Sequence, residues 1–159
     1  MGSFALDLSR FADKAGKVTV DKIQKVAMEA FGRVIMRSPV GNPDLWTAEF
    51  KAVGESLGWF DKNYTGGRFR ANWGVQIGAP WAGTIEAKDP TPVGDKSGPT
   101  VAAAEWKASE WNGVGSIFLS NNLPYAIPLE YGHSKQAPGG MVRVTIAELQ
   151  GGAAEAAVK

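Results

Sequence analysis

The chain has 159 residues, a length that fits one domain, and 44% of them are hydrophobic, which favours a globular fold over disorder. Lysine and arginine number 17 against 16 acidic residues and form no basic run, so the composition argues against a protein that holds nucleic acid by neutralising its phosphates. Cysteine is absent, which excludes disulfides, thiolate metal sites and cysteine nucleophiles.

The first residues carry a weak structural signal. Residues 4–11, FALDLSRF, alternate apolar and polar residues at their start and could form a short strand or a docked arm, so residues 1–16 are set apart as an N-terminal arm. Asp7 and Arg10 come too early for a signal peptide, and no apolar run approaches the length of a membrane span. We therefore expect a soluble product made in the cytoplasm.

The strongest periodic segment covers residues 20–37. Its apolar residues recur at the spacing of an amphipathic helix and comprise Val20, Ile23, Val26, Ala27, Ala30, Phe31, Val34 and Ile35. Pro39 follows at once, and the residue before a proline avoids the helical region, so the helix should end near Ser38. This pattern predicts one long amphipathic helix with Phe31 and Val34 in the core.

Residues 39–67 give weaker signals but are rich in aromatic side chains. Residues 44–53 could form a short helix. The aromatic residues are too many for a free linker, and they comprise Trp46, Phe50, Trp59, Phe60 and Tyr64. Long segments of this kind in small domains are usually functional or locally structured.

An alternating segment follows. Phe69, Ala71, Trp73, Val75 and Ile77 alternate with polar residues or glycine, which predicts a half-buried strand. With Phe69 and Trp73 in the core, Arg68 and Arg70 would point outward. Residues 84–87 could form a short partner strand.

The rest of the chain alternates loops with short elements. The pattern predicts a loop over 88–100, a helix over 100–111, a strand over 113–120, a short helix or turn over 124–131 and a last helix over 141–149, with a tail at 150–159 that could extend or fray. The sequence thus predicts a single α+β domain over 1–159, in which the long helix packs on a small antiparallel sheet beside further short helices.

His133 is the only histidine and the first residue to test for catalysis. A hydrolase triad would need Ser134 or Ser116 as nucleophile and a carboxylate such as Glu130, yet no G-x-S-x-G elbow occurs, and adjacent residues rarely reach triad geometry. The chain has no metal-binding motif and no phosphate loop, so we expect no cofactor and no metal. A small hydrolase that uses His133 is the distant alternative.

The remaining candidates are contact and core residues. Arginine and tryptophan are enriched at the centres of protein interfaces, which favours a partner protein over nucleic acid. The expected interface residues are Trp46, Trp59, Phe60, Arg68, Arg70, His133 and Lys135. Tyr125, Leu129 and Tyr131 are expected to anchor a corner of the fold on the sheet, with Met141 behind them, before a polar loop at 133–140.

Several short strings resemble the small tail-component family of long-tailed bacteriophages, the neck or tail-completion proteins. The strings are FALDLSRF (4–11), MRSPV (36–40), GGRFRANW (66–73), NNLPYA (121–126), LEYGHS (129–134) and PGGMVR (138–143). Their number and order carry the resemblance, which spans residues 4–149. The chain departs from the family pattern after Val40, where the family has Asp-Thr-Gly and this chain has a longer insert, 41–67, that could face a neighbouring ring.

The resemblance implies a structural virion protein rather than an enzyme. It implies a ring of identical subunits, expected to be a hexamer, at the head–tail joint. The partners would be the head-closure or connector protein, the tail terminator and the tail tube proteins, with DNA only passing through the lumen and no membrane involved. A tail terminator that caps the tail tube is the nearest alternative.

Overall fold

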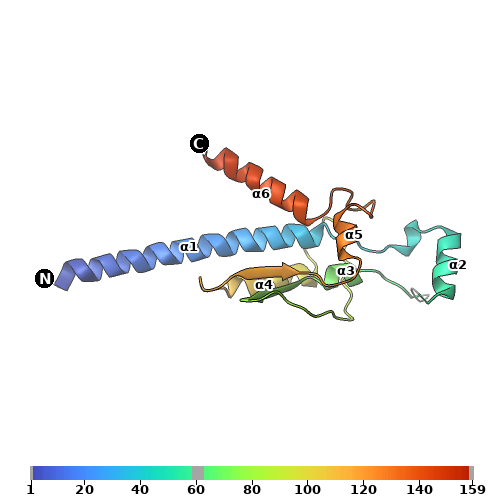
Figure 1. Ribbon diagram of the computed structural model, residues 1–159, viewed down its shortest axis with the longest axis horizontal. Helices are drawn as coiled ribbons and strands as arrows, with labels where there is room; N and C mark the ends of the chain where they lie inside the picture. The colour runs from blue at the N-terminus through green and yellow to red at the C-terminus, as the bar shows by residue number, and fades with distance from the viewer. Residues whose placement is uncertain (1, 59–62, 158–159) are drawn as a thin grey trace.

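The computed structural model describes residues 2–58 and 63–157. Its elements in chain order are α1 (Gly2–Met36), η1 (Pro43–Leu45), α2 (Ala48–Ser56), α3 (Arg68–Ala71), β1 (Gly74–Ile77), α4 (Pro99–Ser109), β2 (Ile117–Ser120), α5 (Ala126–Glu130) and α6 (Val142–Ala157). Figure 1 shows α1 along the middle of the molecule, with α6 on one side, and α4 and the two strands on the other. The prediction of a single α+β domain is confirmed. No helix in the described ranges has both the length and the apolar character that crossing a membrane requires.

Residues 19–36 are helical, as the periodic pattern predicts. The helix ends where expected, because the Ser38 amide bonds to Ile35 O at 3.0 Å and its hydroxyl donates to Val34 O at 3.1 Å. Residues 4–11 are helical as well and belong to α1, so of the two alternatives, a short strand or a docked arm, the strand is wrong. Alternation over a few residues does not separate strand from helix, and Phe4, Leu8 and Phe11 also fit helical spacing.

The sheet has two strands. β1 pairs antiparallel with β2, and the register runs from Gly74 opposite Ser120 to Ile77 opposite Ile117. Residues 84–87 do not add a strand. The Asn72 side chain accepts the Ile85 N–H at 2.8 Å and donates to the Ile85 carbonyl oxygen at 3.0 Å, so these backbone groups do not pair with a strand.

The core consists of two clusters that meet on the sheet. One gathers Val34, Phe69, Leu123, Ala137 and Met141, and the other gathers Ile35, Val101 and Ala104, with Phe31 half-buried against it. Trp73 and Leu119 contact both clusters. Trp73 also donates its indole N–H to Ser38 Oγ at 2.6 Å, which ties β1 to the end of α1.

The segment before β1 is a helical turn, so the expectation of a strand with outward arginines is wrong. α3 starts from Gly67, which has φ +86° and follows Gly66 with φ +73°. Two consecutive residues in the left-handed region bend the chain sharply, which an L side chain resists and glycine allows. The turn rotates Arg70 inward, where its side chain is fully buried.

The other helices are found with shifted bounds. α2 starts and ends a few residues later than the expected range 44–53, and α5 is shorter at both ends than the turn expected over 124–131. α6 continues to Ala157, so most of the expected tail extends the last helix.

Candidate interaction surfaces

The corner at residues 121–143 is organised by the Glu130 carboxylate. It accepts three backbone N–H bonds at the start of α6, from Met141 and Arg143 at 2.9 Å and from Val142 at 3.0 Å. These are amides that a helix start otherwise leaves without partners. Gly140 allows the close approach, since a Cβ there would overlap the Glu130 carbonyl oxygen. Glu130 therefore caps α6, so the carboxylate considered for the triad is engaged by the start of that helix.

His133 lies at the surface of this corner. Its backbone N–H donates to Pro128 O at 3.2 Å, and its side chain is exposed. The Ser134 hydroxyl accepts the Gln136 amide at 3.2 Å. Within the described residues, no hydrogen bond links His133 to a serine or a carboxylate, so the structure does not assemble the triad considered for it.

Glu130 gives the fold a defined pH dependence. Burial alone would raise the pKa of this carboxyl. The hydrogen bonds from the amides of residues 141–143 together outweigh burial, so the pKa lies below its usual value of 4.5. A depressed folded-state pKa adds stability above the unfolded value, and that stability is lost as the pH falls through the folded value.

We expect Glu130→Gln to cost about 1–3 kcal/mol of unfolding free energy at neutral pH and much less at an acid pH below the depressed folded-state pKa of Glu130, because the wild-type carboxylate is protonated there and its charge-assisted bonds are lost. Urea unfolding at both pH values measures this difference. Glu86→Gln is the control, since that carboxyl pairs with Arg68 but is 83% exposed, and it should change little at either pH. An equal loss for Glu130→Gln at both pH values would contradict the capping role.

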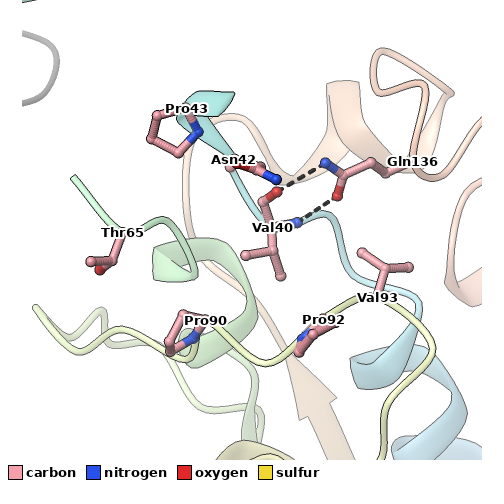
Figure 2. Close-up of a pocket in the computed structure, with 9 residues that line it drawn as sticks. Val40, Asn42, Pro43, Thr65, Pro90, Pro92, Val93 and Gln136 are labelled. Atoms are coloured by element: carbon pink, nitrogen blue, oxygen red, sulfur yellow. Dashed lines mark hydrogen bonds between the residues drawn. The ribbon is translucent and has the colours of Figure 1, made fainter. Parts of the chain in front are cut away.

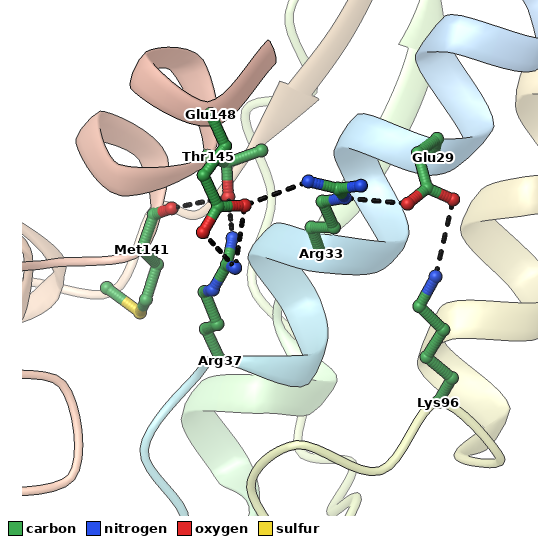
Figure 3. Close-up of polar contacts among 7 residues, drawn as sticks. All are labelled: Glu29, Arg33, Arg37, Lys96, Met141, Thr145 and Glu148. Carbon is green, nitrogen blue, oxygen red and sulfur yellow. Dashed lines mark hydrogen bonds and ion pairs between the residues drawn. The ribbon is translucent and has the colours of Figure 1, made fainter. Parts of the chain in front are cut away.

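Charged side chains brace α6 against the end of α1 (Figure 3). Glu148 accepts from Arg37 at 2.7 Å and from Arg33 at 2.8 Å, and Arg33 also pairs with Glu29 at 2.6 Å. Lys96 extends the network to Glu29 at 3.3 Å. The positive charges at this end of α1 are thus matched within the chain.

The described part of the insert at 41–67 lies at one end of the molecule, where η1 and α2 form an arm (Figure 1). Trp46 contacts Phe50 edge to face and Tyr64 in a tilted arrangement, both with 5.3 Å between ring centroids. Burial raises the pKa of Tyr64, and this effect outweighs the opposite effect of the nearby Arg68 charge. Trp46, Phe50 and Tyr64 therefore pack on one another, as a segment too aromatic for a free linker would. Trp59 and Phe60 lie outside the described residues.

A cleft of about 440 Å³ lies between this arm and the corner at 121–143. Trp46, Phe50 and Tyr64 line one side, and Tyr125 and His133 line the other. A neighbouring hollow of about 400 Å³ is lined by Pro43, Pro90, Pro92 and further residues drawn in Figure 2.

Gln136 separates the cleft from the hollow and ties down the loop 133–140. Its side-chain amide accepts the Val40 N–H at 2.9 Å and donates to Val40 O at 2.9 Å, as a paired strand would (Figure 2). The next residue, Ala137, is buried in the core. The polar loop expected at 133–140 is therefore anchored at its centre.

The expected interface residues differ in their exposure to solvent. Arg68 is partly exposed and pairs with Glu86 at 2.6 Å, whereas Arg70 is buried and cannot face a partner. Trp46 is half-buried in the arm, and His133 and Lys135 are exposed at the corner. Arg70 is the clear error, because its alternation with apolar residues comes from a helical turn.

The expected core residues are mostly placed well. Val34, Phe69 and Met141 are buried, while Phe31, Trp73 and Leu129 pack at the edges of the clusters. Tyr125 is 39% exposed and contacts Phe69 at 6.0 Å between ring centroids. Tyr131 is 66% exposed and lies under the Arg143 guanidinium at 4.7 Å, so its expected role as an anchor on the sheet is wrong.

Sequence reasoning also misplaced two residues of the long helix. One face of α1 contacts α4 and the residues that follow α4. On this face Phe31 and Ile35 pack in the core, and the Gln24 side chain donates to Ser109 O and Trp111 O. Ile23 and Val26 belong to the same apolar pattern but are 42% and 56% exposed.

In the described part of the chain, no group of three histidine, aspartate or glutamate residues could hold a metal ion. No protein-family model, curated protein or solved structure matches this chain.

Proposed function

We propose that this protein is a structural subunit of a tailed-phage virion that forms a ring at the head–tail joint, between the head connector and the tail. The observation that carries the proposal is the exposure of aliphatic side chains on two separate helices. Ile23 and Val26 on α1 are 42% and 56% exposed, and Val53 and Leu57 at α2 are 49% and 59% exposed. Exposed apolar residues gathered on a helix face commonly mark protein contacts.

The placement of these residues suits a ring. The α2 arm lies at one end of the molecule, and α1 runs away from it toward the other end (Figure 1). A closed ring needs two different surfaces on each subunit, because every contact joins unlike faces of neighbouring copies. A two-fold dimer would instead need one surface that complements itself.

The residues that carry the family resemblance support an assembly role. Gly66 and Gly67 start the α3 turn, Arg70 is buried beneath it, and Glu130 caps α6. These motif residues hold the corners of the fold in place. They therefore support a scaffold that presents surfaces rather than a pocket that performs chemistry.

The proposed partners follow from this position. Copies of the chain, proposed as six, would contact one another within the ring, and the connector, tail terminator and tail tube proteins would lie above and below. DNA would pass through the lumen, and the near-balanced charge of the chain, +1 at neutral pH, would limit its binding to phosphate. No cofactor is proposed.

Removing the gene from the phage that carries it tests this role. We expect full heads and tails of normal length that remain unattached, as seen by electron microscopy of the lysate. Tails of excessive length would favour the tail terminator instead, because an uncapped tube would continue to grow. Intact infectious particles would contradict both roles. His133→Ala should leave particle yield unchanged, since that side chain is exposed and, in the part of the chain that the structure describes, forms no hydrogen bond to a serine or a carboxylate.

A further inference from the structure

Two exposed helix faces of this chain match each other in pattern and oppose each other in charge. On α1, Lys22 precedes the exposed Val26 by four residues, with Ile23 beside them, so the three side chains share a face. We call these three residues the basic face. On α2, Glu49 precedes the exposed Val53 by four residues, with Leu57 four residues further on. We call these the acidic face.

The surroundings strengthen the opposition in charge. Residues 17–26 contain three lysines against Asp21, and residues 43–57 contain three carboxylates against Lys51. Lys22, Lys25, Glu49 and Glu55 are exposed, and none of them forms an ion pair within the described residues. This differs from Arg33 and Arg37, whose charges are matched by Glu148. The charges on the two faces are therefore available to a partner.

The two faces cannot meet within one chain. Lys22 lies fourteen residues before the end of α1 at Met36, which corresponds to about 21 Å of helix at 1.5 Å per residue. The α2 arm lies beyond that end of α1 (Figure 1). A contact between the acidic face and the basic face must therefore join two copies.

We propose that the acidic face of one copy docks on the basic face of the next copy, and that this contact closes the ring; the inference rests on the proposed function. Glu49 would pair with Lys22, and Val53 and Leu57 would cover Val26 and Ile23. Complementary charges at the rim fix the register of such a contact and disfavour a face meeting its own kind. Burial of the aliphatic side chains supplies the affinity.

Disulfide cross-linking tests the contact cleanly, because the natural chain has no cysteine. Particles are made with chains that carry V26C, V53C or both, then oxidised and run on a non-reducing gel. We expect a ladder of linked multimers for V26C/V53C, linked dimers only when the two single variants are mixed, and no product for V26C alone. V26C/V93C is the control, because Val93 is also exposed, at 39%, but lies outside both faces.

The outcomes separate this contact from the ring itself. If the chain is present at the joint but V26C/V53C gives no more product than V26C/V93C, the proposed contact is wrong and the ring proposal stands. If particles never contain the chain, the proposed function fails and this inference fails with it.

Reciprocal charge changes provide an independent readout. We expect Lys22→Glu in the V26C/V53C chain, or Glu49→Lys in the same chain, to abolish the ladder, and both changes together to restore it. Lys107→Glu is the control with the same change of charge at an exposed site on α4, outside both faces, and it should leave the ladder intact. Loss of the ladder in the doubly reversed chain would overturn the pairing of Glu49 with Lys22.

Discussion

Arg70→Ala is expected to lower the free energy of unfolding by about 3–5 kcal/mol, the range for removing one partner of a buried ion pair. The Arg70 side chain is fully buried. Its guanidinium donates to the carbonyl oxygens of Thr91 and Pro92, both at 3.0 Å, and to that of Asp95. The substitution would leave these three carbonyls without donors and the loop 89–98 without its anchor.

Asp89 explains why the loss should be large. This carboxylate is 1% exposed and lies 3.6 Å from Arg70 Nε. It accepts hydrogen bonds from Thr91 and from the Thr100 amide at the start of α4. Burial alone would raise the pKa of Asp89, but the hydrogen bonds from Thr100 and Thr91 outweigh it and the pKa is lowered, so the carboxylate stays charged. Without Arg70 it would be a buried anion with no cation beside it.

Urea unfolding measures this prediction, with Arg68→Ala as the matched control two residues away. Arg68 pairs with an exposed Glu86 at the surface, so its loss should cost less than about 1 kcal/mol. Similar losses for the two variants would contradict the buried role assigned to Arg70.

Gly66→Ala is expected to destabilise the protein by about 2–5 kcal/mol. Gly66 has φ +73°, which costs an L residue about 1–2 kcal/mol. A Cβ there would also overlap the carbonyl oxygen of Gly41, which is backbone and cannot rotate away. Relieving such an overlap between packed atoms typically costs a further amount of about 1–3 kcal/mol.

Gly58→Ala separates the cost of the backbone conformation from the cost of the overlap with Gly41. Gly58 has nearly the same backbone angle, φ +69°, but a Cβ there would meet no atom within 4 Å. It should therefore lose only the conformational term, about 1–2 kcal/mol. The urea midpoints of both variants check this difference, and a Gly58→Ala variant as unstable as Gly66→Ala would show that the approach of Gly66 to Gly41 has no energetic weight.

The sequence predicted those parts of the fold whose signals are local. The spacing of Phe31, Val34 and Ile35 predicted the end of α1, and Pro39 located its stop. The alternation at Val75 and Ile77 predicted β1 correctly, because those residues do pair with β2. These patterns depend only on neighbouring residues and on one buried face.

The errors came from contacts between distant residues. Arg70 alternates with apolar residues as an outward strand residue would, and only its acceptors at positions 91, 92 and 95 show why it is buried. Glu130 could be interpreted as the carboxylate of a triad, and only the hydrogen bonds from the start of α6 show that it caps that helix. No local pattern contains such information.

The candidate surfaces were predicted in part. Aromatic enrichment pointed to the insert 41–67, where Trp46, Phe50 and Tyr64 do cluster. The exposure of Ile23 and Val26 could not be predicted, because it depends on how much of α1 is covered by α4 and α6. A pattern shows that a face is apolar, but not whether the same chain covers it.

A density map of the head–tail joint in intact particles would show the proposed ring itself. We expect a closed ring of copies of this chain between connector and tail, in which the α2 arm of each copy reaches α1 of the next. A joint resolved at the side-chain level that contains no copy of this chain would contradict it.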